Sequence, residues 1–182
     1  MNDGDILDLI RADPWMMRVL HAAAGLNLPD WMIGAGFVRN KVWDHLHGFA
    51  NAEVPTADID LIYFDPTDLR ENCEKEYDRQ LCVACDVNWS AKNQARMHEV
   101  TGDAPYTSTA DGLAHWVETA ACVAVTLQGG ALRLIAPHGT ADLAGLIVRR
   151  SPAFKRDIGI MRERVASKQW LEKWPRLQLV LE

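Results

Sequence analysis

Two aspartates separated by a single residue, Asp58 and Asp60, form the pair of side chains in this sequence best suited to chemistry. Side chains alternate between the two faces of a β-strand, so both carboxylates would share one face if this segment is extended. Carboxylates that close repel each other unless a cation lies between them. Mg²⁺ and Mn²⁺ prefer oxygen ligands, and Mg²⁺ usually completes its shell with water and substrate phosphates. The pair therefore predicts a divalent-metal site.

The segment that carries the pair, residues 58–65, reads as a strand with a period of two. The pair shares a face with Ile62 and Phe64, so the acids lie at the amino end and the apolar part runs inward. Haloacid dehalogenase-like phosphatases carry Asp-x-Asp at the carboxyl end of a buried parallel strand, so this position argues against that class. An edge strand with both charges turned to water remains the alternative.

A glycine-rich turn, residues 34–36, separates a short apolar strand at 31–33 from a helix that runs from about residue 37 to 47. Glycines at such a turn let backbone N–H groups approach a phosphate, and the helix N-terminus favours the negative charge. Arg39 and Asn40 lie in the first helical turn and could reach the same anion. Turns also need glycine for their own geometry, and polar residues often line a solvated helix face. The candidate phosphate ligands are Gly34, Ala35, Gly36, Arg39 and Asn40.

The other local patterns predict helices and strands in mixed order. Asp13-Pro14 reads as an N-cap followed by proline at the first helical position. Residues 82–92 read as a strand, and Gly129-Gly130 joins two apolar runs in a plausible hairpin. This mixture predicts an α+β fold, or α/β with a mixed sheet, in which helices flank the sheet.

The glycine turn, the helix and the strand that opens with Asp-x-Asp together resemble the DNA polymerase beta-like nucleotidyltransferase superfamily. More closely, the chain is similar to a family of small bacterial nucleotidyltransferase-like proteins whose substrates are largely uncharacterised. The strings that carry the resemblance are GAGFVRNKVWDHLHG (34–48), DIDLIYFD (58–65), KNQARMH (92–98), Pro105-Tyr106, WVETAACVAV (116–125) and KQWLEKWP (168–175). It implies a single nucleotidyltransferase-like domain over residues 1–182. Its parts would be N-terminal helices over 1–30, a catalytic core over 31–150 and a C-terminal helical segment over 151–182.

The chemistry implied by the resemblance is transfer of a nucleoside monophosphate from a nucleoside triphosphate to an acceptor hydroxyl, on a small molecule, a protein or an RNA end. Asp58 and Asp60 would hold Mg²⁺ or Mn²⁺, which bridges to the triphosphate. The backbone of residues 34–36 would cradle its phosphates. A third carboxylate is expected on a later strand. The first candidate is Asp86, with Glu118 and Asp142 in reserve.

The resemblance also draws attention to later polar residues. Lys92 and Arg96, four residues apart, could face the phosphates or the acceptor, although such a polar run is usually a solvated turn. Tyr106 could stack on a base or simply pack. The chain departs from the superfamily at Ala35, where Gly or Ser usually follows the first glycine. The loop at 48–57 is longer than usual and would lie near the site.

Composition limits the partners. The chain has 182 residues, 48% hydrophobic and 24% charged, as expected for a folded protein. Its net charge of −6 argues against extended DNA as a partner, because phosphates reward a basic face. No stretch reaches the roughly 18 apolar residues of a membrane span, and residues 1–5 lack the pattern of a signal peptide. Four cysteines do not make a disulfide framework, so we expect a cytoplasmic protein without membrane contact.

Two functions remain open. One is a metal-dependent nucleotidyltransferase. The other is a catalytically degenerate module that holds a nucleotide or a partner protein without turnover. Three acids around one cleft favour the enzyme, whereas two acids without a third favour the module.

Overall fold

The structure is a computed structural model in which residues 1–49 and 58–181 are described, so most of the loop expected at 48–57 lies outside them. The helices and strands, in chain order, are α1 (Asp3–Arg11), α2 (Pro14–Gly25), β1 (Met32–Ile33), α3 (Gly36–His47), β2 (Ile59–Tyr63), α4 (Glu71–Ala84), β3 (Trp89–Asn93), α5 (Gln94–Thr101), α6 (Thr109–Ala114), β4 (Ala124–Gln128), β5 (Ala131–Ile135), α7 (Ala141–Ala144), β6 (Ile147–Arg149), α8 (Ile158–Ser167), α9 (Trp170–Lys173) and β7 (Gln178–Val180). Within the described ranges, no helix has the length and apolar character needed to cross a membrane.

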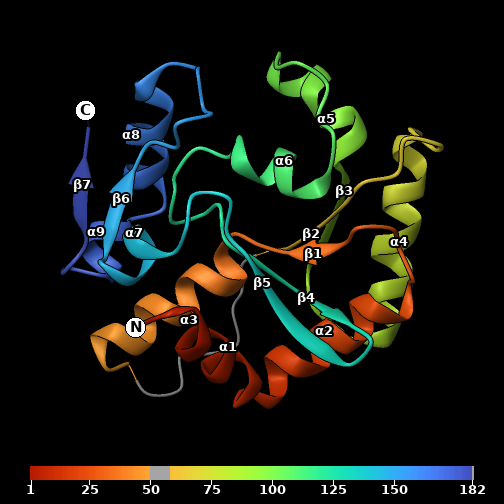
Figure 1. Ribbon diagram of the computed structural model, residues 1–182, viewed down its shortest axis with the longest axis horizontal. Coiled ribbons are helices and arrows are strands. Elements are labelled where there is room, and N and C mark those ends of the chain that lie inside the picture. The colour runs from red at the N-terminus through yellow and green to blue at the C-terminus, as the bar shows by residue number, and fades with distance from the viewer. Residues whose placement is uncertain (50–57, 182) are drawn as a thin grey trace.

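The centre of the fold is a five-stranded sheet in the order β3-β2-β1-β4-β5, and β6 and β7 form a separate two-stranded sheet (Figure 1). β2 and β3 are parallel, whereas the other neighbours in the large sheet are antiparallel. The predicted class, α+β with a mixed sheet flanked by helices, is confirmed. The predicted hairpin is the pair β4 and β5.

Local sequence signals set the helix ends as predicted. Asp13 caps α2, because its carboxylate accepts hydrogen bonds from the N–H groups of Trp15 at 2.9 Å and Met16 at 3.1 Å. Pro14 fills the first helical position, where no N–H is needed. Gly48 ends α3 in the left-handed conformation, with φ of 71°.

β1 leads into the glycine turn and pairs with β2, the strand that carries Asp60. Met32 lies opposite Ile62 of β2, and the N–H of Gly34 donates to the carbonyl of Asp60 at 3.2 Å. The prediction that these two strands are neighbours is therefore confirmed, although both are shorter than expected. This pairing brings the start of α3 next to the acid pair.

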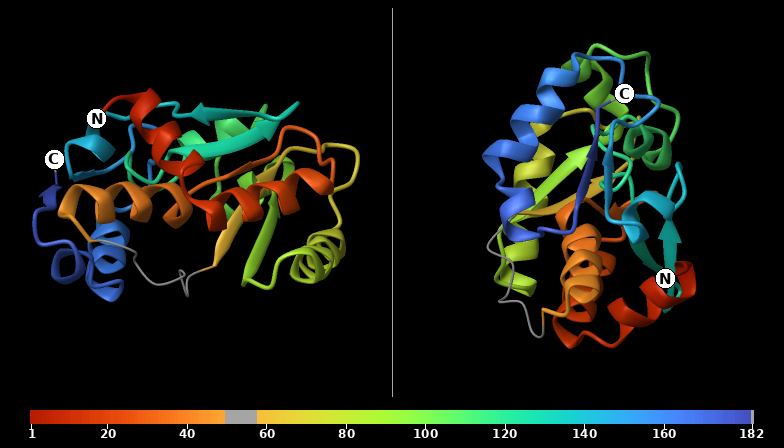
Figure 2. Two further views of the ribbon diagram at one scale, coloured as in Figure 1. Left: turned by 90° about the horizontal axis from the view of Figure 1, so that it is seen from below. Right: turned by 90° about the vertical axis from the view of Figure 1, so that its left-hand side faces the viewer.

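The two faces of β2 meet different surroundings. Ile59, Leu61 and Tyr63 are buried in the main core. α1, α2 and α3 pack on this side of the sheet, and Figure 2 shows these three helices grouped together. Asp60 and Ile62 point to the opposite face, of which α6 covers only a part. The acidic side of β2 is thereby left next to open space.

The boundary between α4 and β3 differs from the expectation. α4 continues to Ala84 and β3 begins at Trp89, so the strand expected over 82–92 is wrong in its first half. Leu81 is buried as part of the helical face, whereas Val83 is 90% exposed. The helical spacing that leads to Leu81 therefore outweighs the short apolar run that follows it.

The C-terminal segment is only partly helical, because β7 returns to pair in parallel with β6. Figure 1 shows α8, α9 and this small sheet gathered on one side. Two tryptophans dock the segment on α3. The rings of Trp170 and Trp174 lie 5.5 and 5.1 Å from that of Trp43, and the Trp174 indole N–H donates to Asp44 at 2.7 Å. This docking brings α8 and α9 up to the acidic side of the sheet.

Candidate functional site

A cavity of about 670 Å³ opens over the acidic side of the large sheet. Asp58 and Asp60 both line it, as predicted, together with residues from α3, β3, α5, α6, α8, α9 and the segment 115–121. Its volume is within the range typical of small-molecule sites. The C-terminal docking described above supplies one wall of this cavity.

The two aspartates differ in their surroundings. Asp60 is partly buried, and burial raises the pKa of its carboxyl; Arg164 opposes that rise, whereas the neighbouring Asp58 adds to it. Asp58 is exposed and accepts a hydrogen bond from the Asn88 amide. A cation between the two carboxylates would offset both the burial of Asp60 and the repulsion.

Arg39, from the first turns of α3, is the most unusual side chain in the cavity wall. It is 4% exposed, and its guanidinium lies 4.2 Å from the ring centroid of Trp170 and 5.2 Å from that of Trp43. Its Nη2 donates to Asn40 at 3.0 Å, but Nε and Nη1 have no partner among the described residues. Burial lowers the pKa of Arg39 to about 10. Buried donors are rarely left unpaired, so this group is suited to receive an anion.

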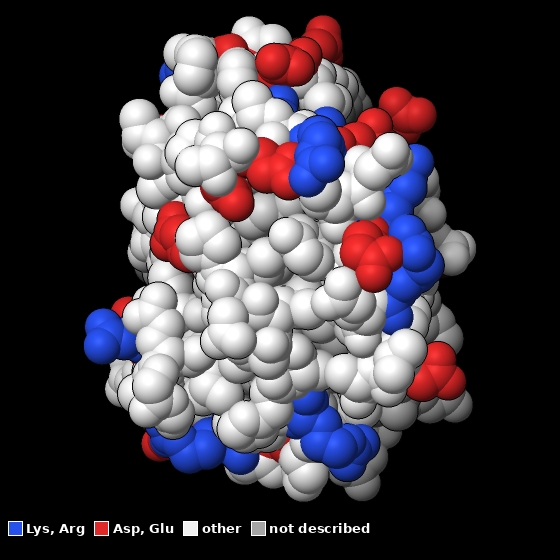
Figure 3. All heavy atoms as spheres, turned by 90° about the vertical axis from the view of Figure 1, so that its right-hand side faces the viewer, with Lys and Arg blue, Asp and Glu red and all other residues white. Residues whose placement is uncertain are grey.

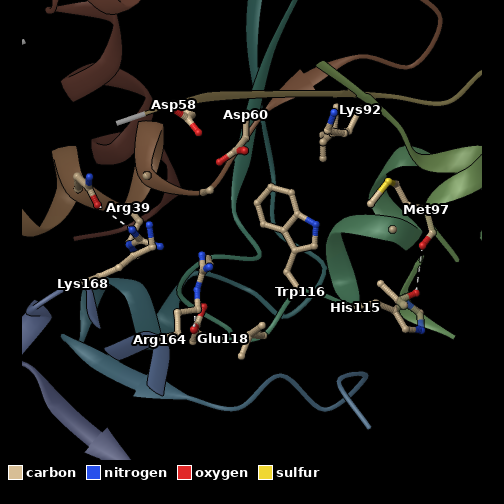
Figure 4. A pocket seen from close by; sticks show the side chains of 18 of the residues that line it. Arg39, Asp58, Asp60, Lys92, Met97, His115, Trp116, Glu118, Arg164 and Lys168 are labelled. Carbon is tan, nitrogen blue, oxygen red and sulfur yellow. Dashed lines mark hydrogen bonds and ion pairs between the residues drawn. The ribbon is translucent and has the colours of Figure 1, made fainter. Parts of the chain in front are cut away.

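Glu118 faces the same space and is fully buried. Its carboxylate is 3.0 Å from Arg164 Nε, but the geometry makes no hydrogen bond, and both of its oxygens are unpartnered within the described chain. Burial raises the pKa of Glu118, and the nearby Arg164 and Arg39 offset part of that rise. We call Arg39, Asp60, Glu118 and Arg164 the open charge cluster (Figure 4).

Positive charge gathers in this cavity although the chain as a whole carries −6. Among the described residues, the lining carboxylates are Asp58, Asp60 and Glu118, and the lining cations are Arg39, Lys92, Arg156, Arg164, Lys168 and Lys173. Figure 4 shows Arg39 and Lys168 together on one side of the acids. By contrast, the face of the molecule that bears α4 has a largely uncharged centre (Figure 3). The excess of cations marks the cavity as a place for an anion.

Sequence reasoning did not assign roles to Arg164, Lys168 or Lys173. Lys168 and Lys173 lie in the string KQWLEKWP, so the resemblance marked their segment, but nothing local shows that it folds back onto Asp60. Their approach depends on the docking of α9 against Trp43, which is a long-range contact.

The glycine turn, residues 34–36, contributes to packing in addition to lining the cavity. Ala35 and Gly36 line the cavity, as does Asn40. Gly34 lies under the ring of Trp116, because a Cβ at this position would be 3.1 Å from that ring. The place expected for Gly34 in a phosphate cradle is therefore covered, and its lack of a side chain is explained by the indole. Ala35 adopts a left-handed φ of 51°, which is strained for alanine.

The expected third carboxylate is not where it was sought. Asp86 is exposed in the segment before β3 and does not line the cavity. Because Trp89 lies opposite Ile59, Asp86 falls beyond the start of β2 rather than beside Asp60. The reserve candidate Asp142 instead accepts from Thr119 and pairs with Arg149, away from the cavity lining. Of the three candidates only Glu118 lines the cavity.

The two cations expected from the polar run after β3 are engaged elsewhere. Arg96 binds Glu74 through Nε at 2.8 Å and Nη2 at 2.6 Å, and it does not line the cavity. Lys92 does line it, but its Nζ is 3.2 Å from the same Glu74. The N–H of Asn93 also donates to Glu74, at 2.9 Å. We call Glu74, Lys92, Asn93 and Arg96 the closed charge cluster.

Protein ligands alone do not complete a metal site here. In residues 1–49 and 58–181, no group of three or more His, Cys, Asp or Glu side chains is placed to hold one ion. A cation on Asp58 and Asp60 would need water or ligand oxygens for the rest of its shell, which is how Mg²⁺ is usually held.

Comparison with known proteins agrees with this arrangement. A family model described as nucleotidyltransferase matches residues 21–179, which is most of the chain. The chain belongs to this nucleotidyltransferase family. Membership supports nucleotidyl transfer in general, and no curated protein sequence matches the chain.

Two solved structures have a similar fold. An NMR structure described as revealing a CCA-adding enzyme head domain is 30% identical, with a TM-score of 0.84 over 98% of this chain and 96% of that one. A tRNA-processing enzyme in an apo form is 17% identical, with a TM-score of 0.50 over 89% of this chain and 44% of that one. The second likeness concerns the fold alone, and this chain spans less than half of that enzyme.

Proposed function

We propose that this protein is a metal-dependent nucleotidyltransferase that moves a nucleoside monophosphate from a nucleoside triphosphate to an acceptor hydroxyl. The observation that carries the proposal is the buried guanidinium of Arg39, whose Nε and Nη1 lack partners among the described residues, in one cavity with Asp58 and Asp60. A polyphosphate matches the donors, and a divalent cation matches the acids.

The residues fit Mg²⁺ or Mn²⁺ as the cofactor. Asp58 and Asp60 would hold the ion, because burial and mutual repulsion make the uncompensated pair unfavourable. When bound, the ion would neutralise phosphate charge and orient the reacting phosphorus.

We assign binding of the phosphates to the arginine and lysine side chains that line the cavity. Arg39 would donate to the triphosphate from α3, and Arg164 and Lys168 would do so from α8 and the residue after it. Ala35, Gly36 and Asn40 contribute the start of α3. We treat residues 1–182 as one catalytic domain, in which the core over 31–150 supplies the acids and the segment over 151–182 supplies these cations.

The reaction is an in-line displacement. The acceptor oxygen forms a bond to the α-phosphorus, the bond from that phosphorus to the β-phosphate oxygen breaks, pyrophosphate leaves, and the hydroxyl proton passes to solvent. Catalysis would come mainly from positioning and from charge neutralisation. Glu118 lies in the cavity with its carboxylate 3.0 Å from Arg164 Nε, so we assign it to positioning that arginine rather than to binding metal.

For the acceptor we propose an RNA end, ahead of a small molecule or a protein. The support is the likeness to a structure described as a CCA-adding enzyme head domain, which has 30% identity over nearly the whole chain. The competing function is a module that binds nucleotide without turnover. What favours it is that Glu118, the one further acid found in the cavity lining of the described chain, is in ion-pair contact with Arg164.

Binding and turnover can be tested separately. Calorimetry with each nucleoside triphosphate should show binding with Mg²⁺ and none in chelator, and a ligand at a hundredfold excess over Kd should add about 2.7 kcal/mol of stability. Labelled triphosphates are then incubated with RNA, protein and small-molecule fractions of a cell extract, with Asp58→Ala and Asp60→Ala as controls. Label transferred to RNA by the wild type alone supports the enzyme. Metal-dependent binding without transfer to any fraction supports the module, and equal binding in chelator contradicts the metal-bridged site.

A further inference from the structure

The cavity has two unlike halves. One half carries the open charge cluster and Lys168. The other, which we call the aromatic half, is lined by Gln94, Met97, Thr101, Tyr106, Gly112, His115 and Trp116. Its two neighbouring cations are engaged elsewhere, since Lys92 pairs with Glu74 and Arg156 stacks on Phe154 with its guanidinium 4.8 Å from the ring centroid. The aromatic half therefore suits a planar, uncharged group rather than phosphate.

Trp116 stands at the boundary between the halves. Figure 4 shows its indole between Asp60 on one side and Met97 and His115 on the other. The ring packs closely over Gly34, where a Cβ would lie 3.1 Å from it. The indole is nevertheless only partly buried. A partly exposed aromatic ring beside the proposed phosphate site is suited to stacking.

Tyr106 does not provide that platform. Its ring is 6% exposed, and its hydroxyl donates to Asp103 at 2.7 Å and lies 2.9 Å from the Thr101 hydroxyl. The ring packs against His115, with 4.9 Å between centroids. Of the two roles open to Tyr106 from the sequence, the structure shows packing. Tyr106 and His115 form the back wall of the aromatic half.

Gln94 supplies a polar edge to this half. Its amide nitrogen donates to the carbonyl of Lys92 at 3.3 Å, which orients the side chain. Its Oε1 lies over Gly112, where a Cβ would come within 2.5 Å of it, and it accepts no hydrogen bond from the described residues. This oxygen is free to accept from the edge of a heteroaromatic ring.

We propose that the aromatic half binds a nucleobase, stacked on Trp116 and edged by Gln94. The proposal rests on the proposed function, because it takes the charged half as the phosphate site. Stacking of a base on an aromatic ring does not depend on which base it is. The base can belong to the incoming triphosphate or to the terminal nucleotide of the acceptor, and the two sources share this chemistry.

The test compares ligands with and without a base. Inorganic triphosphate, ATP, adenosine and the dinucleotide ApA are titrated, at fixed Mg²⁺, into the wild type, Trp116→Ala and Trp116→Phe, with calorimetry for tight ligands and NMR shifts for weak ones. We expect Trp116→Ala to weaken ATP binding about tenfold or more, and Trp116→Phe to weaken it less. Inorganic triphosphate should bind all three proteins equally, which also controls for folding.

The outcomes separate the two proposals. Weakened ATP with unchanged inorganic triphosphate places the base of the incoming nucleotide on Trp116. Weakened ApA with unchanged ATP assigns the same subsite to the acceptor. If inorganic triphosphate does not bind but adenosine binds in a Trp116-dependent way, the base site stands and the phosphate site fails. If no ligand with a base responds to Trp116→Ala, the nucleobase subsite is overturned.

Discussion

Glu74 and Glu118 are both buried glutamates close to arginines, yet their bonding is opposite. Glu74, in the closed charge cluster, accepts hydrogen bonds from Arg96, Lys92 and the Asn93 N–H. Glu118, in the open charge cluster, accepts none from the described residues. Burial acts to raise the pKa of both, but in Glu74 the hydrogen bonds from Arg96 and Asn93 outweigh it and hold the pKa below its usual value. In Glu118 burial prevails and the pKa is raised.

We infer that this difference separates a structural charge cluster from a cluster that binds a ligand. A buried charge with all its hydrogen bonds made adds rigidity and little else. A buried cluster with donors and acceptors left unpaired by the described residues is costly in the free protein, and in our proposal a bound ligand completes it. The comparison predicts that changes in the closed cluster affect stability, whereas changes in the open cluster affect binding and turnover.

The largest expected effect is on turnover, from Asp60→Asn. Loss of this carboxylate should lower the rate of nucleotidyl transfer by about 10²–10³-fold, the range typical for removing one charge-stabilising group. The apo protein should be equally stable or more stable at neutral pH, because the raised pKa of Asp60 means that its charge is unfavourable in the fold. Rates with labelled triphosphate and chemical unfolding measure the two quantities. Asp65→Asn, just after the same strand and outside the cavity lining, is the matched control. Full activity in Asp60→Asn would remove the open cluster from the chemistry.

Next in size is the loss of stability in Glu74→Gln. Removing one partner of a buried ion pair usually costs about 3 kcal/mol or more, because the arginine is left uncompensated. The direction in which stability changes with pH follows from the lowered pKa of Glu74. Its charge stabilises the fold above the unfolded-state pKa, and this contribution is lost as the pH falls through the folded-state pKa. Urea unfolding of both proteins between neutral and acidic pH should show the difference shrinking on acidification. A constant difference would contradict the ionic origin of the effect.

Features with local signals were predicted from the sequence. The capping of α2 by Asp13, the β4 and β5 hairpin and the two faces of β2 follow from turn chemistry and from side-chain alternation. The neighbourhood of Gly34 and Asp60 came from the order of turn, helix and acidic strand. These signals sufficed for the fold class and for the acid pair in the cavity.

Features that depend on long-range packing were not predicted. Asp86, expected as the third carboxylate, lies outside the cavity lining, because the start of β3 depends on where α4 ends and nothing local marks that point. The cover of Gly34 by Trp116 and the approach of Arg164 and Lys168 join segments far apart in the chain. Residue spacing along the sequence does not indicate such contacts, so the part of the cavity lining that comes from the C-terminal segment was not predicted.

A third expected effect concerns Arg39→Lys. Lysine keeps the charge but loses the planar fork that donates two parallel hydrogen bonds and stacks on tryptophan. Inorganic triphosphate with Mg²⁺ should bind about tenfold more weakly, corresponding to about 1.4 kcal/mol. Calorimetry measures this directly, and Arg11→Lys on the exposed side of α1 is the control. Unchanged affinity in Arg39→Lys would show that its unpaired nitrogens do not face the phosphates.

The smallest effect, and the sharpest test of the contrast with Glu74, is expected from Glu118→Gln. The folded-state pKa of Glu118 lies above its unfolded value, so the folded protein favours the uncharged form of this side chain. Wild-type stability therefore falls as the pH rises between those two values, and at neutral pH the wild type carries the full cost. Glutamine has the same shape and no charge, so Glu118→Gln should be as stable as the wild type or more stable, within about 1 kcal/mol. Any stability advantage of Glu118→Gln should vanish below the unfolded-state pKa.

Because Glu118→Gln removes one negative charge from the cavity, inorganic triphosphate should bind somewhat more tightly to it than to the wild type. Urea unfolding over pH and calorimetry measure both effects. Destabilisation as large as that of Glu74→Gln would mean that the ion pair with Arg164 is structural, and the distinction between the closed and open clusters would fail.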